Sequence, residues 1–355
     1  MHSSISLKGL GEERDGPWKA YQPSIILPPV CIRDPALPLV SITTPSYNQG
    51  KFIRETIASV LTQRYPNIEY WVIDGGSTDN TREILREYEH DPRFHWISEP
   101  DEGQADAINK GWARSRGDIV CWLNSDDTYI GNGVIETQIA LLRSSPSIGL
   151  VYGSGYFTDT QGRELRTFTT RPYSYPALLR TGYIVQPTVF LKRAVVQEVG
   201  PLDTTFRFAM DHNYWLRCTA VTTMRESPNL VATYRLHGES KTVSEPIEIN
   251  VDTTWAVCLH LAKEGRRMTT PEQRRRIMAS LLLSLAARAI RGRDMGYARQ
   301  LVTGARQLTL FNVRYLYLPI VLLGNKWGGG IEEAFAERIY ALLQSRLQRR
   351  ATKKR

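Results

Sequence analysis

Two adjacent carboxylates, Asp126 and Asp127, are the side chains in this sequence best placed to do chemistry. They follow residues 118–123, whose apolar composition predicts a buried strand. Neighbouring carboxylates at the end of a strand are costly unless a cation neutralises them. Mg²⁺ or Mn²⁺ would do so, because hard cations bind a few protein carboxylates together with phosphate oxygens. The alternative is a solvated turn, since Asn124 and Ser125 also favour turns.

Strands and helices are predicted to alternate upstream of this acidic pair. Apolar runs at 39–44 and 70–73 predict strands, and apolar residues at helical spacing over 52–61 predict a helix between them. A second helix is predicted over 81–89, preceded by Asp and Asn residues that suit an N-cap. This alternation is typical of an α/β unit with a parallel sheet.

The polar segments that follow three of these strands are expected to meet. Ligands of parallel sheets bind beyond the carboxyl ends of the strands. Residues 44–48, 74–78 and 124–127 should therefore lie along one edge. Three polar strand ends on one edge indicate a binding site rather than three unrelated turns.

Four motifs, taken in their order and spacing, resemble the family 2 glycosyltransferases of the GT-A fold. They are PSYN at 45–48, IDGGSTD at 73–79, DEGQADAINKG at 101–111 and LNSDD at 123–127. The resemblance covers about residues 38–245. It implies a Rossmann-like, mostly parallel sheet flanked by helices, a nucleotide-diphosphate-sugar donor, a divalent metal (Mn²⁺ or Mg²⁺) and inversion of the anomeric configuration.

The resemblance also assigns donor-binding residues in the first two motifs. Thr44, Pro45 and Tyr47 would line the uracil and ribose pocket, with Tyr47 offering its ring to the base. Asp74 would accept a hydrogen bond from the base. Asp74 suits a structural role equally well, because it precedes two glycines in a predicted β-turn.

The third motif is predicted to form a turn followed by a helix over 105–114. The start of this helix could face the diphosphate, because helix N-termini favour anions. By resemblance Gln104 or Asp106 would contact the donor. Capping and solvation are the simpler role for Asp106.

The fourth motif departs from the family's Asp-x-Asp pattern, since Asn124 stands where the first acid would be. Asn124 and Asp126 would contact the donor. Asp126 is also the expected ribose or metal contact, and Asp127 is the expected metal ligand, but the sequence does not separate these two roles. His237 matches a family His-x-x-Ser segment that binds metal or diphosphate, although a single histidine is more often structural. Arg235 and Lys241 could neutralise the diphosphate.

The candidate catalytic base is Asp211, within a segment that resembles an acidic pair before a helix in the family. Met210 replaces the glutamate of that pair. A carboxylate can accept the proton of a sugar hydroxyl as its oxygen attacks carbon 1. Alternatively, Asp211 only caps a helix predicted over 213–219. Residues 186–188 line the acceptor side or simply mark the end of a strand.

Composition indicates one large domain with an appendage, because the chain has 355 residues of which 42% are hydrophobic. We predict an extended arm at 1–37, a GT-A domain at 38–245 and a basic helical region at 246–355. Four widely spaced cysteines predict free thiols in a reducing cytosol. A cytoplasmic protein is expected, because the first residues lack the apolar core of a signal peptide and no run of about 18 apolar residues occurs.

Positive charge is concentrated near the C-terminus. Residues 261–355 contain 20 Lys and Arg against 6 Asp and Glu, a net charge of +14, whereas the whole chain is +9. Amphipathic helices are predicted over 274–290, 295–308 and 331–347. Such helices could lie on the anionic inner face of the plasma membrane, where lipid-linked acceptors reside. The alternative is a solvated helical bundle, and binding to nucleic acid is not expected because no nucleic-acid motif is present.

The predicted function is therefore an inverting, metal-dependent glycosyltransferase. It would move a sugar, with a UDP-sugar as the expected donor, to a glycan or lipid-linked acceptor during polysaccharide or glycoconjugate synthesis. The alternative is a catalytically inactive nucleotide-sugar-binding subunit of a glycan assembly complex, which Asn124 and Met210 favour and the retained acids oppose. The absence of Gly-x-Gly-x-x-Gly after the first strand and of a P-loop disfavours a dehydrogenase or a nucleotidyltransferase.

Overall fold

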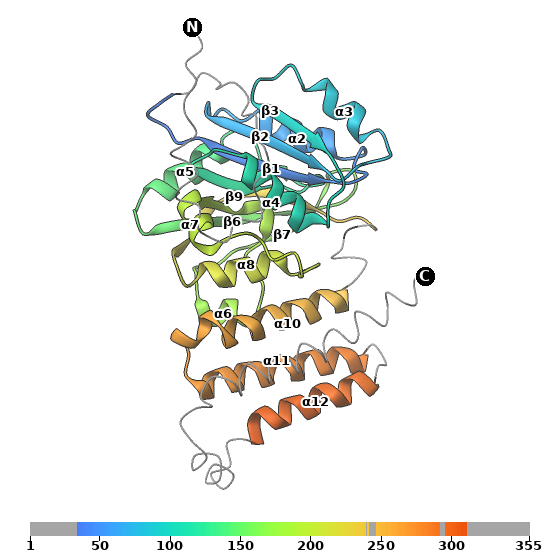
Figure 1. Ribbon diagram of the computed structural model, residues 1–355, viewed down its shortest axis with the longest axis vertical. Coiled ribbons are helices and arrows are strands. Elements are labelled where there is room, and N and C mark those ends of the chain that lie inside the picture. The colour runs from blue at the N-terminus through green and yellow to red at the C-terminus, as the bar shows by residue number, and fades with distance from the viewer. Residues whose placement is uncertain (1–33, 239, 241–245, 292–294, 311–355) are drawn as a thin grey trace. The chain divides into compact units, whose positions relative to one another are not determined.

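The computed structural model of this protein describes residues 34–238, 240, 246–291 and 295–310 (Figure 1). They form two compact units. The first unit contains residues 34–173, Tyr183–Met210 and Val221–His237. The second contains Ser174–Gly182, Asp211–Ala220 and the described residues after 237. The helix predicted over 331–347, Lys241 and most of the predicted N-terminal arm lie outside the described residues.

Within the described chain, the first unit is built on a nine-stranded sheet of order β3-β2-β1-β4-β8-β6-β9-β5, with β7 paired to β6. The strands are β1 (Val40–Ser46), β2 (Ile68–Asp74), β3 (Phe94–Ser98), β4 (Ile119–Trp122), β5 (Thr128–Tyr129), β6 (Ile148–Thr158), β7 (Glu164–Phe168), β8 (Phe190–Lys192) and β9 (Thr223–Arg235). Strands β3, β2, β1 and β4 are mutually parallel, and β8 enters antiparallel between β4 and β6. The predicted α/β fold is confirmed.

Helices cover both faces of this sheet (Figure 1). They are α2 (Ile53–Leu61), α3 (Thr81–Glu87), α4 (Gln104–Arg114), α5 (Val134–Arg143) and α7 (Arg193–Val199), with a 3₁₀ turn η1 (Gln186–Thr188) before β8. Alternate residues of β2 separate the two faces, as the two-residue period of a strand requires. Tyr70 and Val72 pack in the main core with α2 and α5, whereas Trp71 and Ile73 pack with Ala107 of α4.

Helix α4 lies very close to β1. A side chain at Gly111 would collide with Thr43, so glycine is needed at this point of contact. The close approach fixes the later part of α4 against β1. Gln104, the first residue of α4, donates to Asn124 after β4, so the start of the helix lies at the edge of the sheet where β1 and β4 end. This edge carries the candidate site.

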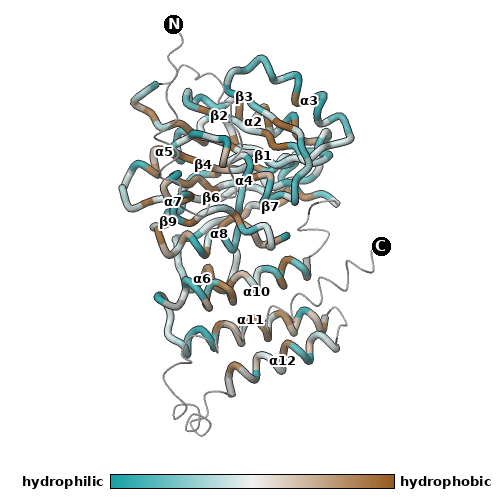
Figure 2. Tube along the Cα trace, in the orientation of Figure 1, coloured by the Kyte–Doolittle hydropathy of each residue, from teal (hydrophilic) through white to brown (hydrophobic). Residues whose placement is uncertain are grey.

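The second unit is helical, as predicted for the C-terminal region. It contains α6 (Tyr175–Leu178), α8 (Met210–Cys218, except its first residue), α10 (Pro246–Ala262), η2 (Glu264–Arg267), α11 (Pro271–Arg291) and α12 (Met295–Leu310). Hydrophobic and hydrophilic stretches alternate along α11 and α12 in Figure 2. Leu282 and Leu285 of α11 and Leu301 of α12 are buried, which is the apolar face expected of packed amphipathic helices.

Three further predictions can be compared with the described residues. Cys121, Cys218 and Cys258 are buried free thiols, as predicted. None of the described helices is both long and apolar enough to span a bilayer. Helix α8 begins at Met210, three residues earlier than predicted, so Asp211 lies in its first turn rather than at its N-cap.

Candidate functional site

The carboxyl ends of three parallel strands lie along one edge of the sheet, as predicted. Ser46 at the end of β1 is level with Asp74 at the end of β2. On the other side of β1, Thr43 is level with Trp122 of β4, and the Leu123 amide donates to the Thr43 carbonyl at 2.9 Å. The segments that follow these strands therefore emerge side by side.

The segment after β1 presents one exposed aromatic ring. Tyr47 is 59% exposed, which suits stacking against a nucleoside base. Thr44 is fully buried, and its hydroxyl lies 2.9 Å from the Tyr70 hydroxyl. Pro45, which lies between Thr44 and Tyr47 in the chain, is also buried. Of these three predicted donor residues, Tyr47 is therefore the one with an exposed side chain.

Asn48 connects the first two segments of the edge. It adopts a left-handed backbone conformation with φ of 53°, which Asn tolerates better than most residues. Its side-chain oxygen accepts from the Thr78 amide at 2.8 Å, and its own amide donates to the Ser77 hydroxyl at 2.7 Å. These bonds fix the loop after β1 against the loop after β2.

Asp74 is fully buried and its carboxylate is engaged by its own surroundings. It accepts from the Ser77 amide at 3.0 Å, from the Ser98 hydroxyl at 2.6 Å and from the Ser77 hydroxyl. These are the contacts of a structural turn residue, which is the second of the two roles that its sequence allowed.

The start of α4 contacts the segment after β4. The Gln104 side-chain amide donates to the Asn124 side-chain oxygen at 2.7 Å. The Asn124 amide donates in turn to the Asp127 carboxylate at 3.1 Å. Asp106 accepts from the Glu102 amide at 3.0 Å and pairs with Lys110 at 3.1 Å, which agrees with the capping role that sequence favoured.

The two adjacent aspartates differ sharply in their surroundings. Asp127 is 1% exposed, and its carboxylate also accepts from the Arg235 amide at 3.0 Å. Burial first, and the negative charge of Asp126 second, raise the pKa of Asp127 well above its ordinary value, while the bonds from Arg235 and Asn124 oppose the rise. Asp127 is thus enclosed by the protein.

Asp126 faces an imidazole instead. Its carboxylate oxygen lies 2.9 Å from His237 Nε2, and the Asp126 side chain is 22% exposed. The His237 ring packs on Phe52 with ring centroids 4.9 Å apart. The structure therefore brings together a partly exposed carboxylate from one strand end and an imidazole from 111 residues further along the chain.

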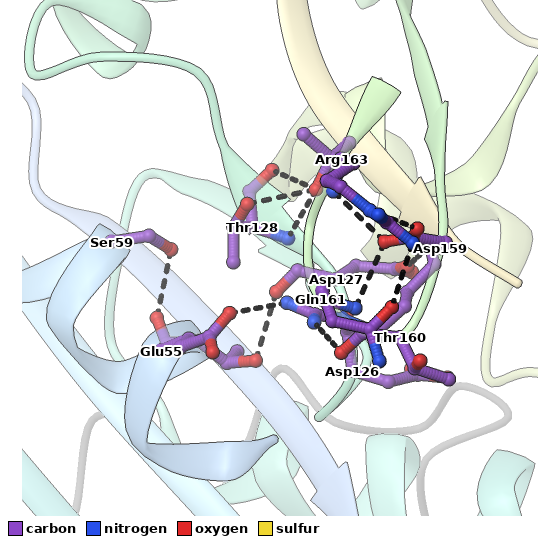
Figure 3. Close-up of polar contacts among 12 residues, drawn as sticks. Glu55, Ser59, Asp126, Asp127, Thr128, Asp159, Thr160, Gln161 and Arg163 are labelled. Atoms are coloured by element: carbon purple, nitrogen blue, oxygen red, sulfur yellow. Dashed lines mark hydrogen bonds and ion pairs between the residues drawn. The ribbon is translucent and has the colours of Figure 1, made fainter. Parts of the chain in front are cut away.

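Arg235 braces this arrangement rather than facing a diphosphate. Its side chain is 3% exposed, and it donates to the carbonyls of Asp126 at 2.9 Å and Thr160 at 3.0 Å and pairs with Glu55. Figure 3 shows Glu55, Asp126 and Thr160, which come from a helix and two loops, grouped in one small region. The Arg235 guanidinium also lies 4.9 Å from the Phe52 ring centroid. The expected role of Arg235 in neutralising the diphosphate is thus not supported by its geometry.

Sequence reasoning missed one residue that holds the acidic pair in place. The Thr56 hydroxyl lies 2.9 Å from both the Ser125 and the Asp127 carbonyls. A signal was present, because Thr56 follows Ile53 by three residues and precedes Val60 by four, so it falls on the apolar face of α2. A fully buried threonine there needs hydrogen-bond partners, and the loop after β4 provides them.

Gln186 and Asp211, two further residues singled out in the sequence, lie in different units of the structure. Gln186 of η1 is buried and donates to the Trp122 carbonyl at 2.7 Å, directly before the acidic segment. Asp211 belongs to the second unit, where its carboxylate accepts from the His212 amide at 2.7 Å. The role of Asp211 as base stays a prediction.

The chemistry of Asp126 and His237 fits a divalent cation. Carboxylate and neutral imidazole are both good ligands of Mn²⁺. Across the described ranges, no group of three or more His, Cys, Asp or Glu side chains is arranged as a metal site. A cation at this edge would therefore take few protein ligands and complete its coordination with other oxygens, as Mg²⁺ and Mn²⁺ do with phosphates.

Comparison with known proteins gives a consistent picture. Residues 41–199 match the model of a family described as Glycosyl transferase family 2. The chain is 30% identical over 243 residues to the O-antigen biosynthesis protein RfbC of Myxococcus xanthus, a match covering 66% of this chain and 19% of that protein. It is 33% identical over 187 residues to an uncharacterized glycosyltransferase of Mycobacterium tuberculosis, covering 52% of this chain and 70% of the relative.

Solved structures share the fold. The S. aureus TarS 1-349 structure in complex with UDP-GlcNAc has a TM-score of 0.53 at 16% identity and covers 69% of this chain and 72% of its own. The mannosyltransferase PcManGT from Pyrobaculum calidifontis in complex with GDP-Man and Mn²⁺ has a TM-score of 0.53 at 17% identity, with coverage of 88% and 87%. At such identities the likeness is one of fold, and it confirms the predicted GT-A architecture.

Proposed function

Because this chain belongs to glycosyltransferase family 2, we propose that it transfers a sugar from a nucleotide-diphosphate sugar to an acceptor hydroxyl, with inversion at carbon 1. The observation that carries the proposal is the Asp126–His237 pair, 2.9 Å apart at the carboxyl edge of the parallel sheet. Ligands of such sheets bind at this edge. The pair combines negative charge with partial exposure, which a bound cation requires.

Asp126 and His237 would hold Mn²⁺ or Mg²⁺, and Asp127 would not be a direct ligand. Asp127 already accepts from Arg235 and Asn124 and is buried, whereas Asp126 is partly exposed. The raised pKa of Asp127, caused in part by Asp126, also supports a cation here, because positive charge would relieve that repulsion. The bound ion would supply charge stabilisation for the departing nucleotide diphosphate.

The donor nucleoside would bind at the ends of β1 and β4. The exposed ring of Tyr47 is suited to stack on the base, with Thr44 and Pro45 shaping the backbone beneath it. Gln104 and Asn124 would approach the donor from the start of α4 and the end of β4. A UDP-sugar is our first choice of donor, since the TarS structure was solved with UDP-GlcNAc, although PcManGT was solved with GDP-Man.

Asp211 would act as the catalytic base. Its carboxylate would accept the proton of the acceptor hydroxyl while that oxygen forms its bond to carbon 1 and the bond from carbon 1 to the diphosphate breaks. Its position in the first turn of α8 supports a fixed orientation, because its carboxylate is held by the His212 amide.

The wider setting would be synthesis of a polysaccharide or glycoconjugate at the cytoplasmic face of a membrane. Support comes from the Myxococcus xanthus relative, which is named for O-antigen biosynthesis and of which this chain spans about a fifth. The net charge of +14 over residues 261–355 supports peripheral contact with anionic lipid.

A panel of UDP-, GDP- and dTDP-sugars tests this proposal by calorimetry and by transfer or hydrolysis assays with Mn²⁺ and with EDTA. We expect one nucleotide class to bind in a metal-dependent way and to lose its sugar. Glu164→Gln, an exposed substitution on β7, is the control and should behave as wild type. Metal-dependent binding without any turnover would favour the inactive subunit, and full turnover in EDTA would contradict the metal assignment.

A further inference from the structure

Side chains from other elements hold the turn that carries the acidic pair. The Asp127 amide donates to the Asn124 carbonyl at 3.1 Å, which closes the turn. The Thr56 hydroxyl lies 2.9 Å from the carbonyls of both Ser125 and Asp127, so its single proton is shared between them or donated to one. Thr56 is fully buried, and its hydroxyl therefore takes the place of the water that these carbonyls would otherwise bind.

The carbonyl between these two is held from a second element. Arg235 of β9 donates from Nε to the Asp126 carbonyl at 2.9 Å. Its backbone amide donates to the Asp127 carboxylate at 3.0 Å. Thr56 of α2 and Arg235 of β9 thus fix the backbone on both sides of Asp126. The direction of the Asp126 carboxylate depends on this backbone, because only χ1 and χ2 separate the two.

Helix α2 also contacts the second proposed ligand of the cation. The Phe52 ring, at the start of the helix, has its centroid 4.9 Å from that of His237. Phe52 is 8% exposed, and the Arg235 guanidinium carbon lies 4.9 Å from the same ring. The imidazole of His237 therefore packs against a ring that is itself held in place. Asp126 and His237, 2.9 Å apart, are each supported by α2.

One face of α2 makes these contacts. It carries four residues spaced by three and four positions, which places them on the same side of the helix: Phe52, Glu55, Thr56 and Ser59. Glu55 pairs with Arg235, and the Ser59 hydroxyl accepts from the Tyr129 amide at 3.2 Å, just after the acidic pair. Figure 3 shows Glu55 and Ser59 on this helix beside the labelled acidic pair.

Electrostatic repulsion explains why the turn needs this support before a cation binds. Adjacent ionised carboxylates repel each other, so a turn free to change its conformation would move Asp126 away from Asp127. The hydrogen bonds to the carbonyls of the turn oppose that movement. A cation then meets ligands that already have their positions, and less conformational entropy is lost on binding.

We propose that Thr56 and Phe52 are positioning residues of the cation site. Thr56 holds the turn that presents Asp126, and Phe52 holds the imidazole of His237, and neither side chain touches the ion. The inference rests on the proposed function, because it concerns the cation site assigned there. Loss of either support should weaken cation binding by about 10–100-fold, the usual effect of changing a residue that orients a metal ligand.

The test is the Mn²⁺ affinity of the full chain with saturating UDP, measured by electron paramagnetic resonance against Mn²⁺ and UDP without protein. Thr56→Val removes the hydroxyl and keeps the branched shape, so it should weaken Mn²⁺ binding by at least about tenfold. Thr56→Ser keeps the hydroxyl and should bind as the wild type does. Phe52→Leu stays apolar but lacks the ring, and should weaken binding to a similar extent even if Thr56→Val does not fold.

Thr219 offers a matched control in the second unit. It is a buried threonine whose hydroxyl donates to the Leu216 carbonyl at 2.6 Å. Thr219→Val should lower the melting temperature as Thr56→Val does, because each change removes a buried hydroxyl that donates to a carbonyl. It should leave the Mn²⁺ affinity unchanged. Thermal melting and Mn²⁺ affinity together therefore separate positioning from a general loss of stability.

Wild-type Mn²⁺ affinity in Thr56→Val would overturn the role of Thr56, and wild-type affinity in Phe52→Leu would overturn that of Phe52. Equal losses of affinity in Thr56→Val and Thr219→Val would also overturn the proposal. If the wild type itself does not bind Mn²⁺ with UDP, the proposed cation site fails and this inference fails with it. The two kinds of failure are distinct, because only the first requires a wild type that binds the ion.

Discussion

The carboxyl edge of the sheet and the helical second unit bury an ionisable side chain in opposite ways. At the edge, the buried Asp127 accepts hydrogen bonds from Arg235 and Asn124. In the second unit, His212 is 5% exposed, and neither ring nitrogen has a hydrogen-bond partner among the described residues. Burial first, and the neighbouring His260 second, lower the pKa of His212 to about 4.

This difference distinguishes a site from a core. A buried carboxylate with a raised pKa beside a second, partly exposed carboxylate favours a bound cation, because positive charge would stabilise the charged form of both. A buried imidazole without hydrogen-bond partners is held neutral and contributes to packing. Acidic conditions that protonate it should lower the stability of the fold. The first arrangement predicts effects on ligand binding, and the second predicts effects on folding.

The largest expected effect tests whether the second unit also contributes chemistry. Asp211 adjoins His212 in α8 but has its carboxylate near the helix start. Asp211→Asn should lower transfer by about 10²–10⁴-fold, the usual contribution of a general base, with donor binding unchanged. Steady-state transfer and donor binding are measured together. If the variant transfers at the wild-type rate, or fails to fold, then Asp211 has only a structural role.

The next prediction concerns how the unfolding free energy depends on pH, which tests the role of the buried His212 in the second unit. The folded pKa of His212 lies below the unfolded value of about 6.5, so the unfolded state binds more protons between pH 6.5 and 4. The unfolding free energy should therefore fall as pH drops through this window, by up to about 3 kcal/mol. Chemical denaturation of the full chain at several pH values measures it.

His212→Leu should remove this acid sensitivity, because leucine fills a similar apolar site and cannot be protonated. The exposed His90→Leu is the control and should retain the wild-type pH profile. Unchanged acid sensitivity in His212→Leu would show that His212 is not the group responsible.

The smallest effect concerns the outer surface of the second unit. Arg288 is exposed on α11, as are the nearby apolar Leu283 and Ile290. If the proposed contact with anionic lipid is correct, Arg288→Gln should weaken binding to vesicles containing phosphatidylserine by about fivefold, the equivalent of about 1 kcal/mol. Binding should also fall with added salt, because screening acts over about 8 Å at physiological ionic strength.

The exposed Arg82→Gln in the first unit is the matched control for these vesicle measurements. Equal binding of the wild type to neutral and anionic vesicles, measured by sedimentation, would contradict the electrostatic contact. Equal losses from Arg82 and from α11 would show that the attraction is general and not a property of this helix.

The sequence allowed much of the first unit to be predicted, because local patterns determine it. Short apolar runs identified β1, β2 and β4, and the predicted parallel arrangement then placed their polar ends at one edge. The different surroundings of Asp126 and Asp127 could not be predicted from such local patterns. It depends on the amide of Arg235, 108 residues away, which turns Asp127 into a buried acceptor.

Two other features could not be read locally for similar reasons. The buried Arg235 looks like a phosphate-binding cation in sequence, and only its contacts with Glu55 and two loop carbonyls define it as a brace. The hydrogen bond from Gln186 to the Trp122 carbonyl joins two segments that are 64 residues apart in the chain. Neither arrangement leaves a periodic signal.

The most direct test of the central claim is Mn²⁺ binding in the presence of UDP, measured by electron paramagnetic resonance for Asp126→Asn, Asp127→Asn and the control His95→Gln. Our assignment of the cation to Asp126 and His237 predicts that Asp126→Asn weakens Mn²⁺ binding by about 10²-fold, as loss of a charged ligand should. Asp127→Asn and His95→Gln should bind Mn²⁺ within a few-fold of wild type. Strong binding by Asp126→Asn together with loss of binding by Asp127→Asn would contradict the account.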